Sequence, residues 1–189
     1  MSKSFTDRER EIVRGKLVDA CRECWRRYGY HKTNVREMSA MANISTGAFY
    51  QFYASKELLF VEAAQETERE AKRLAEENMT RYSGKRGVAE ALKAIVRFMS
   101  VEPWIMQSDW DVILRKLPPD FVESDFMRDI SLVERYAADF GLKAKLESER
   151  LALVINTILM TVRNRKFLPG DVDGAIDFII DAAVDKMFE

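Results

Sequence analysis

NISTGAFYQFYASKELL, residues 43–59, holds four aromatic side chains in a segment too short and too polar to build a core alone. In a helix, Phe49 and Tyr53 share one side because they lie four residues apart. Gly47 and Gln51 then fall on the opposite side. The pattern predicts a short helix that two aromatics anchor, with small and hydrogen-bonding side chains facing outward.

A second short helix is predicted just before this segment, over residues 35–42, with Thr33 or Asn34 as its N-cap. Ser45 is the expected N-cap of the helix over residues 46–53. Between them, Asn43 tolerates the left-handed backbone that a tight turn needs. Two short helices joined by such a turn indicate a helix-turn-helix motif, which reads base edges in the DNA major groove.

The rest of the chain has helical periodicity and no sustained strand alternation, so the sequence predicts an all-α fold of about nine helices. We expect helices at residues 6–28, 35–42, 46–53, 55–81, 88–101, between Pro103 and Pro118, and at residues 120–140, 145–166 and 171–188. We expect a DNA-binding domain over residues 1–54 and a helical effector-binding and dimerisation domain over residues 55–189.

Charge divides the chain in the same way. Residues 1–56 carry 11 Lys and Arg against 6 Asp and Glu, whereas residues 57–189 carry 19 against 25. A basic N-terminal part on an acidic remainder indicates that only the first part meets a polyanion, although ordinary surface variation would give a similar difference.

Residues 17–60, LVDACRECWRRYGYHKTNVREMSAMANISTGAFYQFYASKELLF, resemble the DNA-binding domain of the TetR/AcrR family of bacterial transcriptional regulators. The positions that carry the resemblance are Gly29, Thr33, Asn34, Val35, Met38, Ser39, Ile44, Ser45, Gly47, Tyr50, Tyr53 and residues 55–58. Three positions depart from the family pattern: Asn43 stands for the usual glycine, Asn34 for threonine, and Phe52 for histidine or tyrosine.

The resemblance implies roles for single residues. Thr46, Gly47, Ala48 and Gln51 occupy base-facing positions. Tyr50 and Lys56 occupy positions that contact the DNA backbone, while Thr33 and Asn34 lie at the helix entry near a phosphate. Ser45 completes this DNA-binding set. Without the resemblance, Tyr50 would read as a half-buried surface aromatic, and Lys56 as a solvated charge.

Large, adaptable side chains cluster around residues 102–113, EPWIMQSDWDVI, and suit either an apolar ligand cavity or a simple core. The resemblance favours an effector pocket. Its candidate residues are Phe98, Met99, Trp104, Met106, Gln107, Trp110, Phe126, Met127, Tyr136, Asn156 and Met160.

The two C-terminal helices are apolar over more than one face, which predicts a homodimer interface. Its candidates are Leu151, Ile155, Ile158, Leu159, Val162, Ile176, Ile179 and Ala183. Two recognition helices one DNA turn apart would then face a palindromic operator.

Other classes of function find little support. His31 is the only histidine, which excludes a His-dependent triad in the C-terminal part, and Cys21 with Cys24 lacks the second ligand pair of a zinc site. We expect no cofactor or metal, no enzyme activity, no membrane association and a cytoplasmic location, since the chain opens without a signal peptide.

The prediction from the sequence is therefore a homodimeric repressor that a small, largely apolar effector releases from double-stranded DNA. A body that docks a protein instead of a small molecule is the alternative, and a small helical enzyme a distant one.

Overall fold

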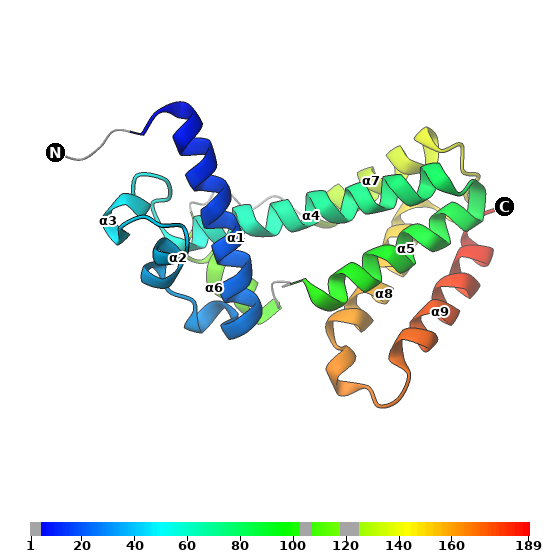
Figure 1. Ribbon diagram of the computed structural model, residues 1–189. Coiled ribbons are helices and arrows are strands. Elements are labelled where there is room, and N and C mark those ends of the chain that lie inside the picture. Colours follow the sequence, from blue (N-terminus) through cyan, green and yellow to red (C-terminus); the bar gives the residue numbers. More distant parts are fainter. Residues whose placement is uncertain (1–4, 103–106, 118–124) are drawn as a thin grey trace. The chain divides into compact units, whose positions relative to one another are not determined.

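The computed structural model describes residues 5–102, 107–117 and 125–189 (Figure 1). Within them, regular structure is helical apart from one isolated antiparallel bridge between Ala144 and Phe188. The helices are α1 (Asp7–Lys32), α2 (Val35–Met41), α3 (Thr46–Phe49), α4 (Lys56–Arg81), α5 (Gly84–Val101), α6 (Gln107–Leu114), α7 (Asp125–Asp139), α8 (Ser148–Arg163) and α9 (Val172–Met187), with a 3₁₀ turn at Arg165–Phe167. The prediction of an all-α fold with nine helices is confirmed in this part of the chain.

The chain forms two compact units, which we call the head unit and the body unit. The head unit comprises residues 1–68 and 102–121, and the body unit comprises residues 69–101 and 122–189. Helix α4 therefore contributes to both, and α6 belongs to the head unit by its packing. None of the helices in the described ranges combines the length and the apolar character of a membrane span.

Helix α1 begins at a capping box. The Thr6 hydroxyl accepts a hydrogen bond from the Glu9 amide, and the Glu9 carboxylate accepts one from the Thr6 amide. Gly29 breaks the helix, because its φ of 73° is a left-handed conformation that favours glycine. The kink redirects the residues that follow it, and Tyr30 is buried whereas Tyr28, before the kink, is exposed.

The core of the head unit is aromatic and closely packed. The Phe60 ring lies 5.1 Å from both the Trp25 and the Tyr30 rings, measured between centroids. Leu17, Met38 and Ile113 are fully buried in the same cluster, so α1, α2 and α6 share it. Burying one such side chain contributes about 1.5–3 kcal/mol, which is enough to hold the two short helices α2 and α3 on a common base.

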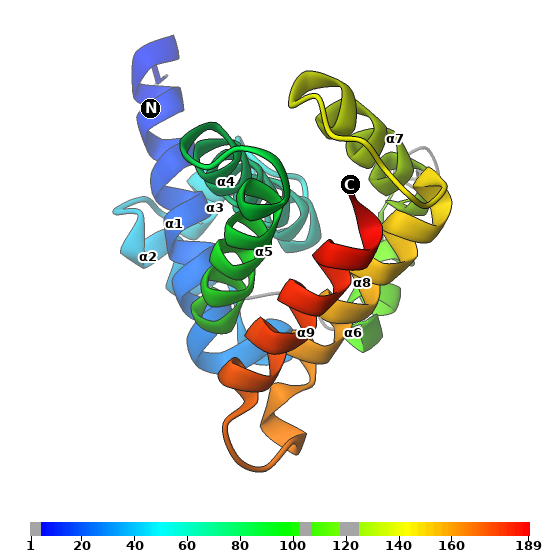
Figure 2. The same ribbon diagram turned by 90° about the vertical axis from the view of Figure 1, so that its right-hand side faces the viewer.

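In the body unit, α8 and α9 run side by side, as Figures 1 and 2 both show, and α5 packs against both of them. Ion pairs set the register of α5 on α9. Lys85 Nζ lies 2.9 Å from Asp185 Oδ1, Lys93 Nζ 2.7 Å from Asp181 Oδ1, and Arg97 Nη2 3.0 Å from Asp177 Oδ2. We call these three pairs the α5–α9 zipper; their order shows that the two helices are antiparallel.

Candidate nucleic-acid interface

Helix α3 begins at a well-formed turn and is short. Asn43 adopts φ 59°, the left-handed conformation predicted for it, and the Ser45 hydroxyl accepts a hydrogen bond from the Ala48 amide at 3.1 Å. The helix ends at Phe49, before the predicted end at Tyr53. Beyond it the chain tightens, since the Gln51 amide donates to the Ala48 carbonyl, three residues back. Gln51 therefore lies in a turn that continues α3.

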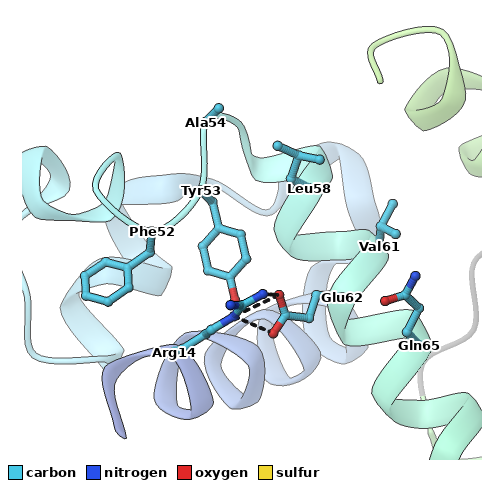
Figure 3. A pocket seen from close by; sticks show the side chains of 8 residues that line it. All are labelled: Arg14, Phe52, Tyr53, Ala54, Leu58, Val61, Glu62 and Gln65. Carbon is cyan, nitrogen blue, oxygen red and sulfur yellow. Dashed lines mark hydrogen bonds and ion pairs between the residues drawn. The ribbon is translucent and has the colours of Figure 1, made fainter. Parts of the chain in front are cut away.

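The predicted anchors of α3 are confirmed, because Phe49 and Tyr53 are both buried in the head core. Their rings lie 5.8 Å apart. Arg14 of α1 lies 5.7 Å from the Tyr53 ring centre and forms a two-pronged ion pair with Glu62 of α4 (Figure 3). Burial, with the nearby Glu62 carboxylate, raises the pKa of the Tyr53 hydroxyl, which finds no hydrogen-bond partner among the described residues.

A hollow of about 260 Å³ lies beside this ion pair (Figure 3). Its other lining residues are Phe52, Tyr53, Ala54, Leu58, Val61 and Gln65. Because Arg14 and Glu62 neutralise each other, the hollow has no uncompensated charge with which to select an ionic ligand.

The outward face of α3 is open. Thr46, Gly47 and Gln51 are exposed, and Tyr50 is 57% exposed, so the structure brings these predicted residues together on one surface. A β-carbon on Gly47 would meet only the Ser45 hydroxyl, at 3.9 Å, which is ordinary contact. Nothing in the packing of the chain therefore requires a glycine here. Ala48 is half-buried behind this face.

At the entry of α2, the two residues predicted to lie near a phosphate, Thr33 and Asn34, differ in exposure. Asn34 is exposed and caps the helix, with its side-chain oxygen accepting from the Glu37 amide at 3.0 Å. Thr33 is buried, and its hydroxyl donates to the Gly29 carbonyl at 2.8 Å. The Thr33 side chain thus closes the Gly29 kink, while Asn34 stays at the surface.

Lys56 is engaged inside the chain. Its ammonium donates to the carbonyls of Tyr30, at 3.1 Å, and Thr33, at 2.9 Å, and lies 4.3 Å from the centre of the Tyr30 ring. Partial burial lowers the pKa of Lys56. The first turn of α4 is therefore tied to the α1–α2 connection by the same group that was expected to contact the DNA backbone.

A buried polar network lies beside Lys56. The Tyr30 hydroxyl donates to Glu57 Oε1 at 2.7 Å. Lys116, just beyond α6, donates to the Tyr30 hydroxyl oxygen at 3.2 Å and to Glu57 Oε1 at 3.3 Å. Burial acts to raise the pKa of Glu57, but the hydrogen bonds from Tyr30 and Lys116 outweigh it and leave the pKa lowered. Sequence analysis missed this network; the only signal was an acidic residue just before the apolar run of residues 58–61 in α4.

The predicted pocket residues that the structure describes differ in burial. Met99 is buried, whereas Phe98, Tyr136 and Asn156 are half-buried, and Met160 is 47% exposed on α8. The side chains of Gln107, Trp110, Phe126 and Met127, and the whole of Trp104 and Met106, lie outside the described residues. An effector cavity stays a prediction.

The expected dimer residues fall into two groups. The chain's own core buries Leu151, Ile158, Val162 and Ile176, while Ile155, Leu159 and Ala183 are half-buried and Ile179 is exposed. Helix α5 packs against both α8 and α9, and several apolar residues of these two helices remain exposed. They are Leu153 and Met160 on α8 with Phe178 and Ile179 on α9.

Residues 17–63 match the family model described as bacterial regulatory proteins, tetR family. That span runs from the buried face of α1 through α3 to the Lys56 and Glu57 contacts. The N-terminal part of the chain is therefore a DNA-binding domain of the TetR family. Members of this family are DNA-binding transcription regulators and not enzymes, as expected from the sequence, and they bind DNA operators and small-molecule effectors.

Solved structures share the TetR fold over nearly the whole chain. A TetR-family regulator from Pectobacterium atrosepticum is 21% identical and covers 96% of this chain and 94% of its own, with a TM-score of 0.61. RolR in complex with resorcinol is 18% identical, with coverage of 95% and 88% and a TM-score of 0.60. FadR from Bacillus subtilis, in complex with stearoyl-CoA, is 13% identical, with coverage of 91% and 98% and a TM-score of 0.57. No curated protein sequence matches.

Proposed function

We propose that this chain is a ligand-responsive repressor that binds a palindromic operator as a homodimer in the cytoplasm. The observation that carries the proposal is the outward face of α3. Its exposed residues Thr46, Gly47, Tyr50 and Gln51 stand on the buried Phe49 and Tyr53. A rigid base under a small, polar, exposed surface is what a side chain needs to meet base edges in a reproducible position.

Within this surface we assign base reading to Thr46, Gly47, Ala48 and Gln51, and backbone contacts to Tyr50, Asn34 and Ser45. Thr33 and Lys56 do not contact the DNA directly in this assignment. Their hydrogen bonds to the carbonyls around the Gly29 kink fix the entry of α2, so they support phosphate binding through the backbone that they hold.

The exposed apolar residues of α8 and α9 support the homodimer. Phe178 is 74% exposed, and Leu153, Met160 and Ile179 are each about half exposed. Side chains of this kind on two adjacent helices suit an isologous contact in which the same pair packs on its copy. A protein partner of another kind is the alternative occupant of this face, and the mass of the purified protein in solution decides between them.

Release of DNA requires that an effector bind the conformation with low DNA affinity more tightly than the conformation that binds the operator. Helix α4 contributes residues to both units, so a ligand that shifts its C-terminal half in the body unit would also displace Lys56 and Glu57. The equilibrium moves only by the ligand's differential affinity for the two states. Among proteins of this fold, RolR was solved with resorcinol and FadR with stearoyl-CoA, which supports an organic, largely apolar effector.

The proposal is tested by selecting bound sequences from a randomised duplex library and measuring the affinity of the protein for the most enriched sequence. We expect a two-fold symmetric sequence and an affinity that falls steeply with salt, as phosphate neutralisation requires. Gln51→Ala should flatten the preference at one base pair in each half-site, at a cost of about 1–3 kcal/mol on the selected sequence. A library that shows no enrichment would refute the function, and a uniform loss across sequences would remove Gln51 from base reading.

A further inference from the structure

The N-terminal end of α1 lies against the end of the recognition segment. Arg10 Nη2 donates a hydrogen bond to the Gln51 carbonyl at 3.0 Å, across 41 residues of sequence. The same guanidinium lies 5.1 Å from the centre of the Phe52 ring. The Phe52 ring also packs against Phe5, with ring centroids 5.3 Å apart and an edge-on arrangement. The Arg10 side chain therefore contacts both the Gln51 backbone and the Phe52 ring, which follow α3.

This contact matters because α3 has few hydrogen bonds of its own. A helix of four residues gains little from its internal ladder, so neighbouring groups must fix its end. Phe49 and Tyr53 fix the inner side. Gln51, beyond the helix, is exposed, and Arg10 ties its backbone carbonyl to α1. A cation at the carbonyl end of a helix is also electrostatically favourable.

We propose that Arg10 is a positioning residue for DNA recognition: it holds the backbone of Gln51 so that the Gln51 side chain meets one base pair. The inference rests on the proposed function. We assign Arg10 a role through Gln51 and not as a phosphate contact, since its Nη2 donates to the Gln51 carbonyl and its guanidinium lies 5.1 Å from the centre of the Phe52 ring. The role predicts a loss of sequence discrimination, whereas a phosphate contact predicts a weaker dependence on salt.

The matched control is Arg8, which is exposed two residues earlier on α1 and lies about 200° further round the helix. Binding of Arg10→Ala, Arg10→Lys and Arg8→Ala is measured on the selected duplex and on single-base variants of it, at several salt concentrations. We expect Arg10→Ala to reduce discrimination at the Gln51-read base pair about tenfold without changing the salt slope. Arg10→Lys should restore part of the discrimination, because an ammonium can donate to the same carbonyl. Arg8→Ala should retain all of it.

Unchanged discrimination in Arg10→Ala, or a salt slope reduced by about one together with uniform loss, would overturn the proposal in favour of a phosphate contact. A readout without DNA separates this from failure of the proposed function. Amide hydrogen exchange over residues 48–53 should accelerate several-fold in Arg10→Ala and stay unchanged in Arg8→Ala, with melting temperature as the check on folding. Equal exchange in all three proteins would refute the contact itself, whether or not the chain binds DNA.

Discussion

Gly47 is an exposed residue of α3 that no internal contact requires to be a glycine. In a helix, glycine costs about 0.5–1 kcal/mol relative to alanine, so Gly47→Ala should stabilise the fold slightly. Operator affinity should nevertheless fall, because the added methyl group stands between α3 and the base edges. Gly15→Ala is the control, since that position on α1 is also exposed and open, and it should stabilise without changing binding. Urea unfolding and a gel shift measure both quantities; retained affinity in Gly47→Ala would place α3 further from the bases.

Glu57 gives the head a pH dependence of known sign. Its pKa is lowered in the folded state, so its contribution is fully present above the unfolded value of about 4.3 and is lost as pH falls through the folded value. Glu57→Gln should cost about 1–3 kcal/mol of unfolding free energy at pH 7, and this difference should shrink below about pH 4. In a Tyr30→Phe background, which lacks the hydroxyl donor, the pH-dependent part should be smaller. A difference that stays constant down to pH 3 would contradict the assignment.

At the scale of helices, the α5–α9 zipper makes a prediction about register. Asp181→Lys places a second cation beside Lys93 and should destabilise by about 1 kcal/mol, because residue 181 is 57% exposed although Lys93 is only 12% exposed. Adding Lys93→Glu should recover most of that loss. The coupling from the double-mutant cycle should fall as salt is raised, since screening acts on exposed pairs. A coupling energy near zero at low salt would mean that apolar packing alone sets the register.

The same scale shows what the sequence could and could not predict. Residues four apart share a helix face, so the spacing of Phe49 and Tyr53 predicted correctly which aromatics anchor α3. The partner of a helix face is not encoded locally: Leu151, Ile158 and Val162 of α8 were predicted to meet a second copy, and they are buried within the chain itself, while the dimer interface stays a prediction. Likewise, the Lys56 and Arg10 contacts join carbonyls to side chains that lie more than 20 residues away. Periodicity therefore predicted the elements, and only the packing revealed which groups hold the site.

For the molecule as a whole, two glutamate substitutions separate dimerisation from folding. Phe178→Glu replaces a ring that is 74% exposed, so the chain should stay folded but become monomeric and bind the operator far more weakly. Ile158→Glu buries an unpaired charge at a position only 5% exposed, which should cost several kcal/mol and unfold the protein. Light scattering and circular dichroism distinguish the two outcomes. A folded dimer of Phe178→Glu with full operator affinity would move the interface away from α9.

The placement of the aspartates on α9 has a consequence for protein engineering. The three zipper aspartates meet α5, while Phe178 and Ile179 project from the rest of the helix surface. In the proposed dimer, the residues of α9 that align it on α5 are therefore separate from the residues that would contact the second copy. Two versions of the chain, one with an acidic and one with a basic residue at position 178, should therefore reject their own kind and assemble as an obligate mixed pair. Such a pair could carry two different α3 surfaces and address an asymmetric operator.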